Sequence, residues 1–155
     1  MKTNSVLGVH YVSTLDELRS LAERVAQEIA VGDVVLLSGR LGVGKTTFTQ
    51  FLGKALGVQA NITSPTYTLI GEYPVVGHGE IITLIHMDLY RMGQSEKVLP
   101  LSKEYIQDVV GSASRNRAIV VIEWAERLEQ PERFNYWNIT INPGATSYSR
   151  IITIS

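Results

Sequence analysis

Eight consecutive residues combine glycines with a lysine and a threonine at a spacing that suits phosphate binding. They match the pattern G-x-x-x-x-G-K-[ST] at every fixed position: Gly39-Arg40-Leu41-Gly42-Val43-Gly44-Lys45-Thr46. Glycines let the backbone adopt positive φ angles and bring its N–H groups against phosphate oxygens. In such a loop the lysine reaches the β- and γ-phosphates and the hydroxyl holds Mg²⁺, so we expect these roles for Lys45 and Thr46.

The segments on either side are of the kind that position such a loop. Residues 33–38 form a largely apolar run of strand length, and apolar residues recur at helical spacing over 46–56. The order strand, glycine loop, helix directs the partial positive charge of a helix N-terminus at a bound anion. The alternative is a glycine-rich turn that binds no ligand.

Two acidic residues stand at the ends of other apolar strands. Asp88 follows the run 81–87, and Glu123 follows the apolar residues 118–122. Ligands of open α/β sheets bind at the carboxyl edge, so we expect both carboxylates beside the loop, where they can fix Mg²⁺ or its waters. Each could instead be an acid that leaves a strand into solvent.

Neighbouring residues allow more than one role. Ser64 and Thr66, in a proline-broken segment, are either turn formers or part of a loop that senses the γ-phosphate. We expect His86 to be a packed strand histidine rather than a metal ligand, because no second histidine or acid stands at ligand spacing on the same face. Trp124 is expected in the core, although a ring beside the site could pack on a nucleotide or a partner.

The composition narrows the function classes. We interpret the 155 residues as one domain, 1–155. Its 14 basic and 15 acidic residues give a net charge of −1, so no basic field favours direct binding of DNA or RNA. The absence of cysteine excludes disulfides, thiol catalysis and cysteine-bound zinc. We see no export signal and no apolar run approaching about 18 residues, and therefore expect a cytoplasmic protein without a membrane span.

The order of the predicted elements favours a mixed α/β sheet. We expect a helix from residue 15 that begins at Ser13 or Thr14, and an irregular helical segment at 94–110 interrupted at Pro100. Strands are expected at 8–13, 67–73, 80–86, 118–122, 136–141 and 150–154; the pair 67–73 and 80–86 is antiparallel, and the last two form a hairpin around a turn at 142–144 with one face in water.

Five motifs, in this order along the chain, resemble those of the TsaE (YjeE) family, the small P-loop ATPases of bacterial tRNA threonylcarbamoyladenosine biosynthesis. The resemblance covers roughly residues 15–127, and the C-terminal hairpin matches more loosely. The motifs are Gly39-Arg40-Leu41-Gly42-Val43-Gly44-Lys45-Thr46-Thr47-Phe48, Ser64-Pro65-Thr66-Tyr67-Thr68-Leu69, Glu72-Tyr73, His86-Met87-Asp88-Leu89-Tyr90-Arg91 and Ile122-Glu123-Trp124.

The resemblance implies a P-loop NTPase fold, a three-layer α/β/α arrangement with a mainly parallel sheet and antiparallel edge strands. It also implies Mg²⁺-dependent ATP hydrolysis coupled to TsaD and TsaB, which transfer the threonylcarbamoyl group to an adenosine beside the tRNA anticodon. In this family the ATPase does not perform the transfer, so tRNA is reached only through the complex.

Site residues follow from matching positions. The resemblance implies catalytic roles for Lys45, Asp88 and Glu123, and a metal site of Thr46, Glu123 and Asp88. The nucleotide is expected to contact the glycine loop, the loop at 64–66, and residues in the family's other nucleotide-contacting regions, where the alternatives are a helix cap or a surface acid. These residues are Gly39, Arg40, Leu41, Gly42, Val43, Gly44, Lys45, Thr46, Thr47, Ser64, Thr66, Thr14 and Glu126.

Some positions depart from the family pattern. Arg40 stands where the family usually has an acid, Val43 where it has Ala, Pro100 where it has Gly, and Ala125 where it has Pro. Arg40 therefore puts a base at the mouth of the site, which can change the hydrolysis rate or the fit to a partner.

Three function classes remain open. An accessory ATPase that works inside a protein complex is our first interpretation, and the lack of an N-K-x-D segment argues against a GTPase. A small-molecule kinase would need an acceptor pocket and an arginine-bearing lid, for which 115–117 is the candidate. A nucleotide-dependent interaction module without hydrolysis could have the same sequence.

Overall fold

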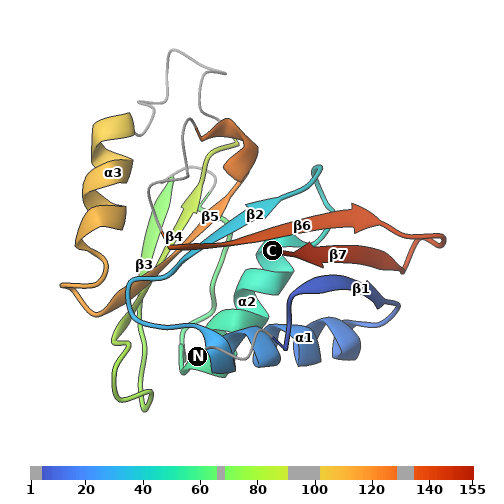
Figure 1. Ribbon diagram of the computed structural model, residues 1–155, viewed down its shortest axis with the longest axis horizontal. Helices are drawn as coiled ribbons and strands as arrows, with labels where there is room; N and C mark the ends of the chain where they lie inside the picture. Colours follow the sequence, from blue (N-terminus) through green and yellow to red (C-terminus); the bar gives the residue numbers. More distant parts are fainter. Residues whose placement is uncertain (1–4, 66–68, 91–101, 129–134) are drawn as a thin grey trace.

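A seven-stranded sheet forms the centre of the structure, in the order β1-β7-β6-β2-β5-β4-β3 (Figure 1). The computed structural model describes residues 5–65, 69–90, 102–128 and 135–155. The central strands β6, β2, β5 and β4 run parallel, whereas β1, β7 and β3 pair antiparallel, which confirms the predicted mixed sheet. The strands are β1 (Gly8–Val12), β2 (Val34–Ser38), β3 (Ile70–Pro74), β4 (Thr83–Asp88), β5 (Ala118–Glu123), β6 (Tyr136–Pro143) and β7 (Arg150–Ile154).

Helices cover both faces of this sheet. α1 (Leu15–Glu28) and α2 (Lys45–Leu56) pack on one face, and α3 (Lys103–Ser112) packs on the other (Figure 1). Alternate residues of β2 therefore enter two cores: Val35 lies with α1 and α2, and Leu36 lies with α3. Coverage of both faces explains why β2 and β5 are continuous apolar runs. The three-layer α/β/α arrangement is confirmed.

Local signals set the helix ends. α1 begins at Thr14, whose Oγ1 accepts a hydrogen bond from the Glu17 amide at 3.1 Å. α2 ends at Gly57, whose φ of +113° is the left-handed conformation of a helix C-cap. Of the helical segment expected at 94–110, residues 103–110 lie in α3, and 94–101 lie outside the described residues. None of the described helices is long and apolar enough to cross a bilayer.

Two antiparallel hairpins form parts of the sheet, as predicted. β3 pairs with β4, and β6 pairs with β7. Buried and more exposed residues alternate along β6, which confirms that one face of this hairpin lies toward water. The predicted turn was wrong in its position: Asn142 and Pro143 still pair with Ile151 and Arg150, so the chain reverses over 144–149 instead. Pro143 is tolerated because it stands at the end of its strand.

One buried carboxylate, that of Asp33, joins the connection between α1 and β2 to β6. Asp33 is 5% exposed, and its Oδ2 accepts hydrogen bonds from the Ala30 amide at 2.9 Å and from Trp137 Nε1 at 3.0 Å. Both donors lose this acceptor in Asp33→Ala, which we expect to lower the free energy of unfolding by about 2–3 kcal/mol.

Urea denaturation measures this change. Asp16→Ala is the matched control, because the contact of Asp16 with Arg19 is exposed and its removal should leave stability nearly unchanged. Equal losses in the two variants would contradict the structural role given to Asp33.

Candidate functional site

The glycine loop forms an open cradle between β2 and α2. Gly42 and Gly44 have φ angles of +77° and +121°, and a Cβ atom added at either residue would meet no atom within 4 Å. α2 begins at the next residue, Lys45, so the free N–H groups of its first turn lie at this cradle. Backbone donors, a helix N-terminus and open space together suit an anion.

The back of the loop is held by the β6–β7 hairpin. Gly39 has a φ of +150°, and an added Cβ would lie 2.5 Å from the carbonyl oxygen of Ile141 in β6. Arg150, at the start of β7, donates from Nε to the carbonyl oxygen of Val43 at 2.8 Å. The loop therefore requires glycine at 39 for close packing, whereas Gly42 and Gly44 leave room in front of it.

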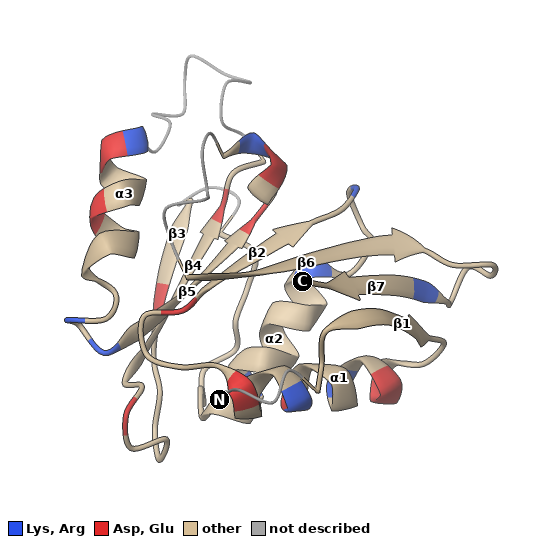
Figure 2. Cartoon of the chain, in the orientation of Figure 1, with Lys and Arg blue, Asp and Glu red and all other residues tan. Residues whose placement is uncertain are grey.

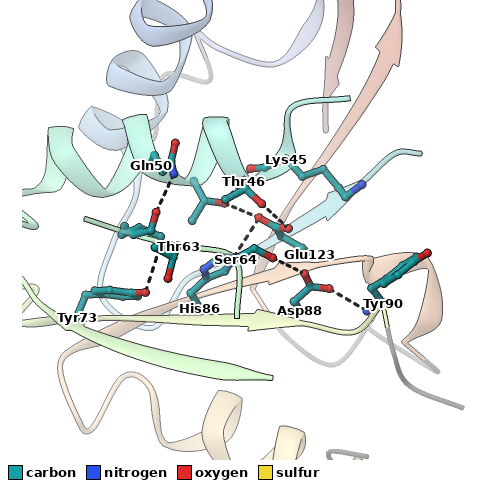
Figure 3. Close-up of polar contacts among 12 residues, drawn as sticks. Lys45, Thr46, Gln50, Thr63, Ser64, Tyr73, His86, Asp88, Tyr90 and Glu123 are labelled. Atoms are coloured by element: carbon teal, nitrogen blue, oxygen red, sulfur yellow. Dashed lines mark hydrogen bonds and ion pairs between the residues drawn. The ribbon is translucent and has the colours of Figure 1, made fainter. Parts of the chain in front are cut away.

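Two acidic residues lie at the carboxyl ends of the neighbouring strands β4 and β5 (Figure 2). The parallel register pairs Asp88 directly with Glu123, and the two side chains are 5% and 2% exposed. Thr46 Oγ1 donates to Glu123 Oε2 at 3.1 Å, which joins the first turn of α2 to the end of β5 (Figure 3). Asp88 accepts from Ser64 Oγ at 3.1 Å and from the Tyr90 amide at 2.9 Å.

The Lys45 ammonium group lies over its own loop. Its Nζ donates to the carbonyl oxygens of Gly39 at 2.5 Å and Arg40 at 3.0 Å, and lies 4.1 Å from the centre of the Trp124 ring. Burial lowers the pKa of Lys45 from its ordinary value of 10.5, and the nearby carboxylates, led by Glu123, oppose this shift. The charge is thus partly desolvated and close to anionic groups.

Trp124 packs against the core on the α3 side of the sheet and also lines the site, so both of the roles considered for it are met in part. The side chain is half-buried, and its ring packs against Tyr90 with 4.9 Å between ring centres. The Arg127 guanidinium lies 5.5 Å from the Trp124 ring centre. Its place at the site has a local cause: the backbone takes a φ of +58° directly after β5, which turns the chain out of the sheet at this residue.

These groups share a pocket of about 250 Å³. Its hydroxyl and carboxylate oxygens are ligands of the kind that Mg²⁺ prefers, and the open glycine cradle beside them has space for phosphate. The residues present therefore fit a nucleotide phosphate chain with Mg²⁺. The lining consists of Leu41, Gly42, Gly44, Lys45, Thr46, Thr47, Ser64, Asp88, Tyr90, Glu123 and Trp124.

Comparison with known families matches residues 12–152 to the family described as threonylcarbamoyl adenosine biosynthesis protein TsaE. The chain belongs to the TsaE family. Its relatives include the tRNA threonylcarbamoyladenosine biosynthesis proteins TsaE of Streptomyces coelicolor, 37% identical over 70% of this chain and 68% of the relative, and of Treponema pallidum, 40% identical over 70% and 73%. The crystal structure of Bacillus subtilis YdiB superposes with a TM-score of 0.63 at 30% identity, over 94% of this chain and 82% of that one, and supports the P-loop NTPase fold.

A second pocket of about 350 Å³ adjoins the loop of this TsaE-family chain on the other side. Thr14 lines it together with Gly42, Val43, Gly44 and Thr47. Glu126 lines neither pocket: it is exposed on the short helix η1 (Ala125–Arg127) and acts on Lys45 only through its charge. Arg40 is exposed and contributes its carbonyl to Lys45. Thr66 lies outside the described residues.

Further polar contacts, beneath and behind the loop, were not predicted from the sequence. His86 is packed as expected, but its Nε2 also contacts Glu123, and Thr49 Oγ1 lies 3.4 Å from the same carboxylate. Arg150 reaches the loop from the C-terminal hairpin. Only His86 had a sequence signal: the expectation that no acid stands on its face was wrong, because Asp88 follows two residues later on the same face of the strand.

Lys45→Met tests the cost of the buried ammonium group. Because its pKa is lowered in the folded state, the charged form destabilises the fold, and this cost is fully present below the folded pKa and disappears as pH rises toward 10.5. We expect Lys45→Met to raise the free energy of unfolding at neutral pH, and to raise it less near pH 10.5.

Urea denaturation at neutral pH and near pH 10.5 measures the difference in free energy of unfolding between Lys45→Met and the parent. Lys54→Met, at an exposed lysine of the same helix, is the control and should show no such pH-dependent difference. A clear loss of stability in Lys45→Met at neutral pH would show that the ammonium group stabilises the fold.

Proposed function

We propose that this chain is a Mg²⁺-dependent ATPase, converting ATP to ADP and phosphate, and an accessory subunit of the TsaD–TsaB pair in tRNA threonylcarbamoyladenosine biosynthesis. The observation that carries the proposal is the convergence of the open glycine cradle with Lys45, Thr46 and Glu123 in one pocket. Membership of the TsaE family and the names of its relatives support the place in tRNA modification, and with it a cytoplasmic location.

Lys45 is assigned to the phosphate chain. Its Nζ contacts two carbonyl oxygens of its own loop, and phosphate oxygens in the cradle can replace them as acceptors. The partial desolvation of this charge strengthens its attraction to an anion, because electrostatic interactions grow as water is removed.

Thr46 and Glu123 are assigned to Mg²⁺. The Thr46 hydroxyl donates its hydrogen to Glu123, which leaves the lone pairs of its oxygen for a cation. Bound Mg²⁺ would neutralise charge on the phosphates during transfer. Asp88, held by Ser64 and the Tyr90 amide, is assigned to orient the attacking water.

The adenosine is assigned to the second pocket. It shares Gly42, Gly44 and Thr47 with the phosphate pocket, so one ligand can extend from one to the other. Thr14 lines this pocket, whereas Glu126 lines neither, and we therefore keep Thr14 and not Glu126 as a nucleoside contact.

Residues 115–117, the candidate lid of a small-molecule kinase, lie far from the site. Residues 115–117 precede β5, whereas the site lies after its carboxyl end, at the opposite edge of the sheet. Arg117 also donates to the carbonyl oxygens of Gly79 and Glu80, which fixes its side chain at that opposite edge.

Single substitutions separate the assigned roles. Glu123→Gln and Asp88→Asn are expected to retain nucleotide binding but to lower hydrolysis by about 10–100-fold, because the cradle and Lys45 remain while metal or water is misplaced. Lys45→Ala is expected to lose tight nucleotide binding. Equilibrium binding of a fluorescent ATP analogue and phosphate release measure the two properties, and parent-like turnover in both acid variants would contradict the assignments.

Steady-state ATP hydrolysis, by the purified chain alone and with the matching TsaD–TsaB pair, tests the whole proposal. We expect slow hydrolysis alone and a sharp rise with the pair. Unchanged hydrolysis with the pair, but consumption of ATP with a small-molecule acceptor, would favour the kinase. Nucleotide binding without hydrolysis under either condition would favour the interaction module.

A further inference from the structure

His86 lies directly beneath the metal-binding carboxylate that the proposed function assigns. It is fully buried in β4, and its Nε2 is 3.1 Å from Glu123 Oε1 (Figure 3). Glu123 lines the phosphate pocket, whereas His86 does not. His86 is thus connected to that pocket through its contact with Glu123.

The two oxygens of Glu123 have different donors. Oε2 accepts from Thr46 Oγ1 at 3.1 Å. Oε1 faces both His86 Nε2 and Thr49 Oγ1, but the single hydroxyl hydrogen of Thr49 has a shorter contact, 3.0 Å, to the carbonyl oxygen of Lys45. Because a carboxylate only accepts, Nε2 carries the hydrogen, and His86 is the principal donor to Oε1.

The other ring nitrogen of His86 indicates that this side chain does more than fill space in the core. Nδ1 is buried and has no hydrogen-bond partner in the described part of the chain. The core on this face of the sheet is otherwise built from apolar side chains such as Leu84 and Val121. An apolar ring would fill this place without an unpaired polar atom, so the contact with Glu123 is the feature of His86 that packing does not require.

We propose that His86 is a positioning residue that, together with Thr46, fixes the plane of the Glu123 carboxylate for the divalent cation bound with the nucleotide. The proposal rests on the proposed Mg²⁺-nucleotide function. With one oxygen held from α2 and the other from β4, the carboxylate cannot turn about its terminal bond, and its remaining lone pairs stay directed at the pocket. Hydrogen-bonded groups behind a metal site commonly act in this way.

Three variants test the contact. His86→Phe keeps the ring and removes the donor, and His86→Asn is a smaller polar variant whose amide stops short of Glu123. His86→Gln restores a donor near the position of Nε2. His10→Phe is the matched control: it makes the same chemical change in β1, where the ring contacts the Val6 carbonyl oxygen, at the far edge of the sheet from β4 and β5.

The measurements are ADP affinity in EDTA, Mn²⁺ affinity of the ADP complex by electron paramagnetic resonance, and thermal unfolding of the ligand-free chain. We expect His86→Phe and His86→Asn to weaken Mn²⁺ binding by about 10–100-fold, with ADP affinity in EDTA unchanged. His86→Gln and His10→Phe should bind Mn²⁺ like the parent. Thermal unfolding identifies which variants fold. One folded donor-free variant, either His86→Phe or His86→Asn, is enough to test the contact.

Several results would overturn the proposal. One is parent-like Mn²⁺ affinity in a folded donor-free variant. Another is a loss of ADP affinity in EDTA as large as the loss of Mn²⁺ affinity, which would indicate a structural role. A His86→Gln variant as weak as His86→Phe would also contradict it. Failure of the parent itself to bind Mn²⁺ with ADP would instead contradict the proposed function, before any variant is compared.

Discussion

The buried carboxylate of Glu123 is the constraint on which the site depends. At 2% exposure it would be costly without hydrogen bonds, and it obtains them from Thr46 in α2 and His86 in β4. These contacts fix the first turn of α2 over the ends of β4 and β5. The same helix start defines the glycine cradle, so the position of one carboxylate and the shape of the phosphate pocket are set together.

Acidic side chains outnumber basic ones in this pocket, where Lys45 faces Asp88 and Glu123. Lys45 lies among Glu123, Asp88 and Glu126, and its desolvation is opposed by their negative charge. Bound phosphates would add negative charge to the cradle. Lys45 and the N-terminus of α2 can offset part of that charge, and a divalent cation bound with the nucleotide would offset more. The pocket thus combines acidic groups with a cation, an arrangement that would suit a metal nucleotide better than either component alone.

The sequence predicted most of the fold because its signals are local. The glycine loop, the N-cap at Thr14 and the apolar runs of β2 and β5 each depend on adjacent residues. The placement of Asp88 and Glu123 at one edge also followed from strand ends. Two contacts could not be predicted because they depend on how distant strands are placed: that of His86 with Glu123 and that of Arg150 with the loop. The place of Trp124 beside Lys45 depends instead on the positive φ directly after β5.

A crystal structure with ADP and Mn²⁺ tests the central account most directly, because the anomalous signal of manganese locates the cation. We predict a manganese peak between Thr46 and Glu123, phosphate oxygens in the cradle at Gly42 and Gly44, and Lys45 Nζ turned from the carbonyl oxygens of its own loop toward the phosphates. Phosphates bound away from the glycine loop, or manganese bound without contact to either residue, would contradict it.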